Sequence, residues 1–277
     1  MEARQGGRTR GRGAGIAPLS GSGLSLRVVG SSSSIPRPNR ACSCYLLQTP
    51  ATSIALDFGT GALAKIQETL SYGALDAVVI THMHADHFLD VIPLRYALKY
   101  GIPNRDRRTP LWLPPNGERI LRSMGNALAR DSAVDFFDEV FDVREYDPKT
   151  AVTIGDFTLT FAPAIHYIEA YAIRAQYGAT SVAYSADTAP SDAVARLASA
   201  CSLFICEATL GLETEEGPDR GHLNAYEAGQ LAHTAGAQRL LITHYGAECI
   251  PAELEAAAAE TYSGPCNIAD DGITFIV

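Results

Sequence analysis

The chain has 277 residues, 47% hydrophobic and 19% charged, which suits one large globular domain or two small ones with a buried core. No apolar run reaches the roughly 20 residues that span a bilayer, and the N-terminus lacks a secretory signal, so we expect a cytoplasmic protein without a membrane partner. The net charge is −9; the first 24 residues hold four arginines and one glutamate, so the others carry −12, which disfavours a long polyanionic partner.

Residues 1–23 are rich in glycine and arginine and show almost no apolar periodicity. This composition predicts a disordered tail or an upstream extension, with a nucleic-acid-binding arm as the alternative. We expect one folded domain over residues 24–277. The six cysteines show no C-x-x-C spacing, which favours reduced, buried thiols over a zinc knuckle or a redox motif.

Short apolar runs and helical patterns alternate from residue 24 onward. The predicted strands and hairpins occupy residues 24–29, 44–49, 53–59, 75–81, 151–164, 171–187, 202–208, 239–245 and 272–277. The predicted helices occupy residues 61–70, 89–101, 116–131, 191–200, 224–237 and 251–264. Within the run at 75–81, residues 77–80 are all apolar, as expected of a strand buried on both faces. This mixture predicts an α/β fold with helices on the outer faces of the sheets.

Residues 81–87 read THMHADH and follow the apolar strand directly. Residues two apart in an extended segment point to the same side, so His82 and His84 can converge on one metal ion. Asp86 and His87 follow where the chain turns, so they can face a second ion. Imidazole nitrogen and carboxylate oxygen are ordinary zinc ligands, and this density of them disfavours a polar loop with chance histidines.

The THMHADH segment resembles the signature of the metallo-β-lactamase superfamily, whose fold is a four-layered αββα sandwich with a dinuclear metal site. His166 in FAPAIHY, Asp187 in YSADT and His244 in LLITHY resemble its later motifs. The resemblance implies two zinc ions, although manganese or iron accepts the same ligands. By resemblance, one metal is held by His82, His84 and His166, the other by Asp86, His87 and His244, and Asp187 bridges both.

Each later motif also has a plain structural interpretation. His166 alone is compatible with a buried core histidine, Asp187 with a helix N-cap, and His244 with a buried strand end. Flavodiiron-type oxygen reductases of this superfamily have glutamate at the second histidine of the signature. The histidine at this position here, His84, therefore favours hydrolysis with zinc. His233 matches no motif, and we expect it to lie on a helix surface or to pack there.

Two further segments resemble ribonuclease Z. CEATL at residues 206–210 is similar to its HEAT segment, and residues 221–244 resemble the stretch before its last ligand. The resemblance implies that Glu207 and His222 assist phosphodiester cleavage, and that Asp86 orients the attacking water or accepts its proton. The alternatives are that Glu207 and His222 cap local turns.

Ribonuclease Z also has a long basic arm between its mid-chain histidine and its bridging aspartate. Only 20 residues separate His166 from Asp187 here, and most of them are predicted strand. The chain instead resembles the bacterial ribonuclease Z-like proteins that include cyclic-nucleotide phosphodiesterases. This resemblance implies a metal-dependent phosphodiesterase that acts on a small nucleotide, cyclic or linear. The alternatives are tRNA 3′-end cleavage, ester or lactone hydrolysis, and a binding module without catalysis. A homodimer is left open.

Overall fold

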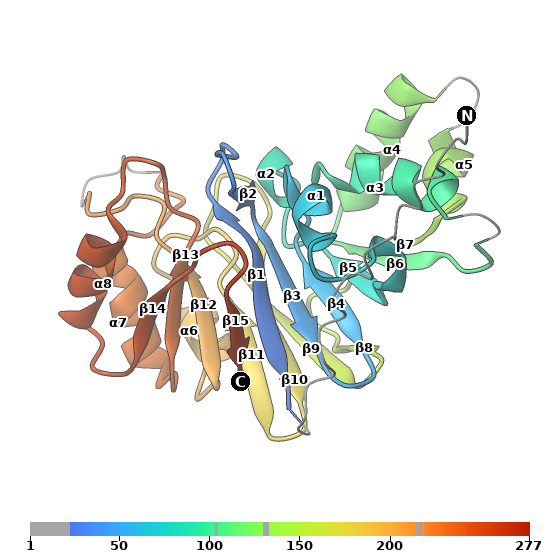
Figure 1. The fold of residues 1–277 in the computed structure, drawn as a ribbon. Helices are drawn as coiled ribbons and strands as arrows, with labels where there is room; N and C mark the ends of the chain where they lie inside the picture. The colour runs from blue at the N-terminus through green and yellow to red at the C-terminus, as the bar shows by residue number, and fades with distance from the viewer. Residues whose placement is uncertain (1–22, 103–104, 130–132, 214–216, 218) are drawn as a thin grey trace, which may run out of the picture.

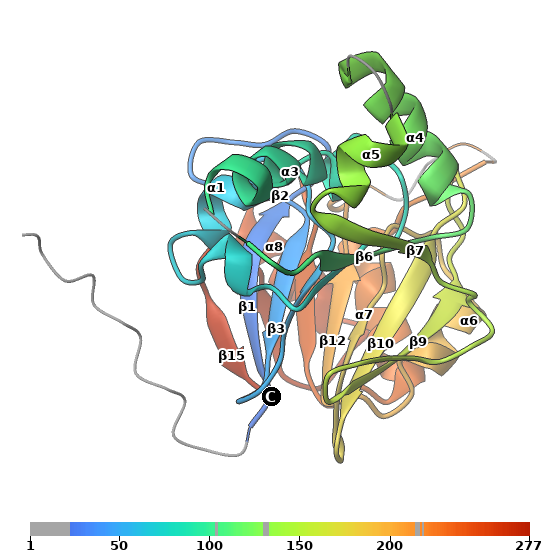
Figure 2. The same cartoon turned by 90° about the vertical axis from the view of Figure 1, so that its right-hand side faces the viewer.

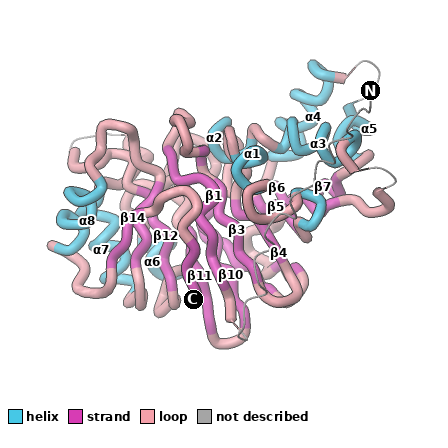
Figure 3. The backbone as a smooth tube through the Cα atoms, viewed as in Figure 1, coloured by secondary structure: helices cyan, strands magenta, loops and turns pink. Residues whose placement is uncertain are grey.

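The computed structural model describes residues 23–102, 105–129, 133–213, 217 and 219–277. Two β-sheets pack face to face, and helices cover both outer faces, as Figure 1 and the perpendicular view of Figure 2 show. In Figure 3 the magenta strands lie between two groups of cyan helices. The predicted four-layered αββα sandwich is confirmed. The predicted tail lies, apart from Gly23, outside the described residues.

The first sheet combines an antiparallel part, from β15 to β4, with a parallel part, from β4 to β7. Its order is β15 (Thr274–Ile276), β1 (Ser25–Ser32), β3 (Cys44–Gln48), β4 (Ser53–Leu56), β5 (Ala77–Val79), β6 (Thr109–Leu113) and β7 (Phe141–Glu145), with β2 (Ala41–Cys42) paired to β1.

The second sheet is parallel from β14 to β11 and antiparallel from β11 to β8. Its order is β14 (Cys266–Ile268), β13 (Leu240–Thr243), β12 (Leu203–Glu207), β11 (Thr180–Tyr184), β10 (Tyr171–Tyr177), β9 (Phe157–Pro163) and β8 (Val152–Ile154). The predicted hairpins turn at Gly155 and Gly178, both at φ +56°, a conformation that glycine adopts without strain.

Two groups of helices cover the sheets. The first sheet carries α1 (Ala62–Ile66), α2 (Ala85–Phe88), α3 (Val91–Tyr100), α4 (Gly117–Leu128) and α5 (Ala133–Asp138), and a short 3₁₀ helix lies at Tyr72–Ala74. The second sheet carries α6 (Asp192–Leu197), α7 (Ala225–Ala235) and α8 (Pro251–Ala259). Within the described residues, no helix combines the length and apolar composition that crossing a bilayer requires. The cytoplasmic location stays a prediction.

Strand β5 shows how the layers share the core. Ala77 and Val79 face the other sheet, whereas Val78 and Ile80 pack against the helices, because successive side chains of a strand point to opposite faces. The predicted burial of this strand on both faces is confirmed. All six cysteines are free thiols, but Cys249 and Cys266 are only partly buried, unlike the other four.

Some elements differ from the sequence prediction. The helix predicted over residues 61–70 ends at Ile66 and continues as turns. Pro93 lies in the first turn of α3, where a missing N–H leaves no gap in the hydrogen-bond ladder. Strands β6, β7 and β14 were not predicted; β6 contains Pro110, which weakens the strand pattern.

Replacing Ile205 by alanine tests the inter-sheet core. Its side chain is fully buried on β12 between the sheets, so we expect Ile205→Ala to lower the free energy of unfolding by about 2–5 kcal/mol. Ile276 is 58% exposed on β15, so Ile276→Ala should change the free energy of unfolding by about 0.5 kcal/mol or less. Urea unfolding of both variants provides the comparison, and equal losses would contradict the assigned core.

Candidate metal centre

The predicted metal-ligand residues all follow the ends of strands at one edge of the two sheets. His82 comes three residues after β5, Asp187 three residues after β11, and His244 directly after β13. His166 lies in the loop between β9 and β10. The fold thus brings together residues that lie up to 162 positions apart, from His82 to His244.

The segment after β5 runs directly into the short helix α2. His84 is the N-cap of α2, and Asp86 and His87 lie inside it rather than in a turn that precedes a helix. Helix α2 packs against the chain after β4, where the Phe58 amide donates to the His87 carbonyl oxygen at 2.7 Å. A Cβ atom at Gly59 would lie 1.9 Å from the Asp86 carbonyl oxygen, so this close approach requires glycine.

The first ligand group joins one carboxylate and three imidazoles: Asp187, His82, His84 and His166. The His84 Nδ1 and His166 Nε2 atoms lie 3.0 Å apart. Asp187 Oδ2 lies 3.7 Å from His82 Nε2 and 3.8 Å from His166 Nε2. Two ligands bound tetrahedrally to one zinc ion lie about 3.3 Å apart, so this spacing is compatible with a metal between them.

The second ligand group contains two carboxylates and two imidazoles and is buried throughout: Asp86, His87, Asp187 and His244. His244 Nε2 lies 3.1 Å from Asp86 Oδ2 and 3.2 Å from His87 Nε2. His87 Nε2 lies 3.3 Å from Asp187 Oδ2. Asp187 belongs to both groups, which is compatible with the bridging role that the family resemblance implies for it.

Hydrogen bonds at Nδ1 orient four of the five imidazoles so that Nε2 faces the centre. His87 Nδ1 donates to Asp57 Oδ2 at 2.7 Å, and His166 Nδ1 donates to the Gly221 carbonyl oxygen at 2.9 Å. His82 Nδ1 and His244 Nδ1 donate to threonine hydroxyls that themselves donate to carboxylates. Such partners fix the tautomer of a metal-ligating histidine, and His84 instead presents Nδ1.

Burial and charge set the protonation of these groups in opposite directions. Burial lowers the pKa of His82 well below its ordinary value, and it also lowers the pKa of His84 and of His166. These rings are therefore neutral near pH 7, as metal ligation requires. Burial alone would lower the pKa of His87 too, but the carboxylates of Asp187 and Asp57 raise it well above the ordinary value.

The carboxylates of Asp86 and Asp187 are both ionised near pH 7. Burial favours the neutral form of Asp86, but the hydrogen bond from His244 and the charge of His87 bring its pKa to about 2. The same histidines hold the pKa of Asp187 well below its ordinary range against its burial. Among the described residues, the buried His82 Nε2 and Asp187 Oδ1 atoms have no hydrogen-bond partner. These unpartnered atoms and the donor set fit a pair of divalent metal ions.

Glu207 and His222 form a pair beside the second ligand group, and with His244 they make a third set of side chains whose possible ligand atoms lie within 4.8 Å of one another. His222 Nδ1 donates to Glu207 Oε1 at 2.9 Å, and the ring centroids of His222 and His244 lie 6.2 Å apart. The fully buried Glu207 carboxylate also accepts from Thr188 N, Thr209 N and the Thr209 hydroxyl. Because Thr209 bonds to His244 Nδ1, the pair is connected to the ligand shell.

The N-caps of α6 and α7 show that neither Asp187 nor His222 caps a helix. Ser191, not Asp187, caps α6, and Asn224, not His222, caps α7 through a capping box with Glu227. Glu207 does accept from the Thr209 amide, so it stabilises that turn in addition to binding His222. The exposed position of His233 on α7 agrees with its predicted surface placement.

Asp57 is a site residue that the sequence analysis missed. Its buried carboxylate accepts from the amide and hydroxyl of Thr81, from His87 Nδ1 and from the Tyr184 hydroxyl. Asp57 has φ +58°, a conformation that aspartate tolerates better than most residues. An aspartate at the end of an apolar strand, before Phe58-Gly59, is the signal that would have indicated it.

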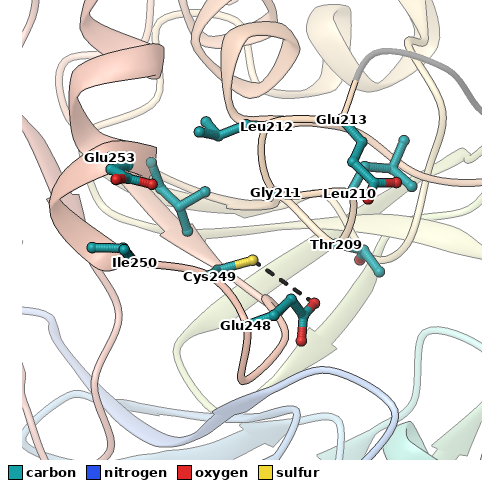
Figure 4. Close-up of a pocket in the computed structure, with 10 residues that line it drawn as sticks. Thr209, Leu210, Gly211, Leu212, Glu213, Glu248, Cys249, Ile250 and Glu253 are labelled. Carbon is teal, nitrogen blue, oxygen red and sulfur yellow. Dashed lines mark hydrogen bonds between the residues drawn. The ribbon is translucent and has the colours of Figure 1, made fainter.

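A pocket of about 400 Å³ opens next to Thr209, which lies between Glu207 and His244. Figure 4 shows its lining, in which Glu213, Glu248 and Glu253 surround apolar side chains. The Cys249 thiol contacts Glu248 Oε1 at 3.9 Å. Carboxylates therefore dominate the charge on this side of the centre.

Comparison with known proteins agrees with this geometry. Residues 54–245, more than half of the chain, match the model of the β-lactamase superfamily domain. The chain belongs to the metallo-β-lactamase superfamily. The match spans every predicted ligand from His82 to His244.

Several relatives in this superfamily match most of the chain. The probable metallo-hydrolase YhfI of Bacillus subtilis is 30% identical over 257 residues, 91% of this chain and 99% of YhfI. Its crystal structure matches with a TM-score of 0.83 at 28% identity, covering 92% and 100% of the two chains. Ribonuclease Z of Methanothermobacter thermautotrophicus is 24% identical over 306 residues, 91% of this chain and 96% of that enzyme.

A more distant structure shares the fold alone. Unliganded yeast PDE1 matches with a TM-score of 0.73 at 14% identity, covering 92% of this chain and 100% of that one. Together these likenesses confirm two predictions: the chain is a hydrolase of the metallo-β-lactamase superfamily, and it lies in the ribonuclease Z-like branch.

Replacing Asp57 by asparagine tests the support of His87. Asparagine keeps the size and tolerates φ +58°, but it loses the charge that holds His87 Nδ1–H. We expect Asp57→Asn to weaken metal affinity about 10–100-fold, as loss of such a partner typically does. Competition with a chromophoric chelator measures the affinity. The control Asp192→Asn, at the exposed start of α6, should match the wild type, and an unchanged Asp57→Asn would contradict the assignment.

Proposed function

We propose that the chain is a dinuclear zinc-dependent phosphodiesterase that acts on a small nucleotide, with cyclic nucleotides as the first substrates to test. The observation that carries the proposal is the hydrogen bond between His222 and the buried Glu207 beside the ligand groups. Hydrolysis of a carboxylic ester or lactone needs no such pair. Likeness to a ribonuclease Z supports phosphodiester chemistry.

The proposed ligands follow the two groups described above. His82, His84 and His166 would hold one ion, Asp86, His87 and His244 the other, and Asp187 both. Nitrogen and carboxylate ligands favour zinc, and manganese or iron would accept them too. When bound, two such ions supply a hydroxide nucleophile and neutralise the phosphoryl oxygens.

The chain's own groups have distinct proposed roles. Asp86, ionised above a pKa of about 2, accepts a hydrogen bond and so orients the attacking water. The Glu207 carboxylate accepts from His222 Nδ1, and this bond does not involve Nε2, which suits proton donation by the ring to the leaving oxygen. Glu207 positions the ring and is itself held by three further donors.

The substrate we propose is small because the described residues around the centre present carboxylates and form no basic arm that could hold a polynucleotide. Residues 167–186, all described, form the hairpin of β10 and β11 and leave no room for a basic arm. The pocket beside Thr209 carries Glu213, Glu248 and Glu253, which repel a row of phosphates. Residues 25–277 carry −12, which adds to this repulsion.

Metal content tests the dinuclear assignment. Elemental analysis of protein purified without chelator, or reloaded with zinc or manganese, should give about two transition-metal ions per chain, because the ligands form two groups that share Asp187. His84→Ala should lower the metal content, since it removes one imidazole from the first group. An absence of bound metal after reloading would refute the proposed centre.

Replacing His222 by alanine separates phosphodiester from ester chemistry. Because His222 belongs to neither proposed metal-ligand set, His222→Ala should retain metal but lose about 10²–10⁴-fold in turnover of bis(p-nitrophenyl) phosphate or 3′,5′-cAMP. The control His233→Ala changes an exposed histidine of α7 and should keep full activity. Full phosphodiesterase activity in His222→Ala would show that the residue has another role, and turnover of a lactone alone would favour the ester hydrolase.

Salt dependence tests the size of the substrate. A small nucleotide held mainly at the centre neutralises few phosphates, so its kcat/KM should change little between low and physiological salt, whereas RNA cleavage should fall steeply. We expect the protein without residues 1–23 to show the same weak salt dependence of kcat/KM as the full chain and to cleave pre-tRNA poorly. Accurate 3′ cleavage of pre-tRNA by this truncated protein at physiological salt would instead establish the tRNA-processing alternative.

A further inference from the structure

Tyr167 is a large aromatic residue that borders the metal centre without belonging to either ligand group. It follows His166 in the loop between β9 and β10, and 54% of the residue is exposed. Its ring centroid lies 5.0 Å from that of His166 and 5.6 Å from that of His222. An aromatic ring thus stands half in solvent beside the proposed proton donor.

The position of the Tyr167 ring is set by Gly221. A Cβ atom at Gly221 would lie 2.9 Å from Tyr167 Cε2 and 3.0 Å from His166 Nδ1. The absence of a side chain therefore lets the ring rest against the backbone that also carries His222. Gly221 also accepts the hydrogen bond from His166 Nδ1, so one backbone segment positions a proposed ligand, the proposed proton donor and the aromatic ring.

The chemistry around Tyr167 differs from that of the pocket beside Thr209. Its loop neighbours Ile165 and Ile168 are 50% and 38% exposed, so this loop presents apolar side chains beside one exposed carboxylate, Glu169, whereas Glu213, Glu248 and Glu253 line the pocket. Of these side chains, the Tyr167 ring is the one placed beside the centre, and an exposed aromatic ring offers a face on which a ligand can stack. The matching ligand is planar and uncharged, with a face that stacks on an aromatic ring.

We propose that Tyr167 is the stacking platform for the nucleobase of a nucleotide whose phosphate lies at the metal centre. The proposal rests on the proposed function for the position of the phosphate. Only a ribose separates phosphate from base, so a phosphate next to His222 leaves the base within reach of a ring centred 5.6 Å from that histidine. Stacking does not depend on the identity of the base, so Tyr167 selects nucleotides over base-free phosphoesters.

Binding of two ligands that differ only in the base tests the platform. Calorimetry on metal-loaded protein compares adenosine 5′-monophosphate with ribose 5-phosphate in the wild type, Tyr167→Phe and Tyr167→Leu. We expect the wild type to bind the nucleotide at least about ten-fold more tightly than the sugar phosphate, Tyr167→Phe to keep that preference, and Tyr167→Leu to lose it. Affinity for ribose 5-phosphate should stay the same in all three.

A matched control and a kinetic measurement complete the test. Tyr100→Leu changes a 71% exposed tyrosine on α3 and should leave the nucleotide preference intact. For a cyclic nucleotide, Tyr167→Leu should raise KM and leave kcat nearly unchanged, which a structural disruption near His222 would not do. Equal weakening of both ligands, loss of the preference in Tyr167→Phe, or no preference in the wild type would overturn the platform.

The binding test needs no turnover and is therefore independent of the proposed reaction. Suppose that the wild type binds the nucleotide more tightly than the sugar phosphate, that this preference is lost in Tyr167→Leu, and that the wild type nevertheless hydrolyses no phosphodiester. In that case the proposed function fails and the platform stands. If phosphodiesters are hydrolysed with equal efficiency whether or not they carry a base, and Tyr167→Leu changes nothing, the function stands and the platform is refuted.

Discussion

The buried carboxylate of Asp57 joins the two sheets at the edge where the candidate centre lies. It accepts hydrogen bonds from Thr81 after β5, from His87 in α2 and from Tyr184 at the end of β11. Leaving a buried polar group without its partner costs about 1–3 kcal/mol. This one carboxylate therefore fixes the register of three segments that carry proposed ligands, and the rest of the centre depends on it.

The centre concentrates five imidazoles and two carboxylates in a largely buried space, an arrangement that is destabilising unless the charges are compensated. Part of the compensation comes from the chain, through the hydrogen bonds at Nδ1 and the ion pairs of His87 with Asp57 and Asp187. Among the described residues, His82 Nε2 and Asp187 Oδ1 have no hydrogen-bond partner, so the compensation of polar groups by the chain is incomplete at these two atoms. Bound cations would complete it, so metal binding and the stability of this edge are physically linked.

The two sides of the centre differ in character because they come from different loops. The side at Thr209 combines the segments after β12 and β13 and carries carboxylates. The side at Tyr167 belongs to the loop between β9 and β10 and exposes Ile165, Tyr167 and Ile168 with a single carboxylate, Glu169. A substrate that places a phosphate between them meets repulsion of further charge on one side and a surface for a planar group on the other. The proposed selectivity for a small nucleotide would then follow from these two loop regions.

Local patterns in the sequence determined much of this protein. The H-x-H-x-D-H run after a buried strand predicted clustered ligands, because spacing within one strand and turn settles which side chains share a side. The apolar strands predicted layered sheets. The later residues His166, Asp187 and His244 were assigned only through resemblance, since no local rule connects positions so far apart.

Only the tertiary structure decided which distant groups meet. Asp57 reads as the end of a strand, and its role arises from contacts with Thr81, His87 and Tyr184, the last 127 residues away. No sequence pattern distinguishes Tyr167 from the other aromatic residues. Its position beside His222 depends on the absence of a side chain at Gly221. Strands β6 and β7 likewise form because the neighbouring strands offer hydrogen-bond partners, in spite of Pro110. Sequence patterns encode periodicity along the chain, whereas hydrogen bonds and packing between separated segments exist only after the chain has folded.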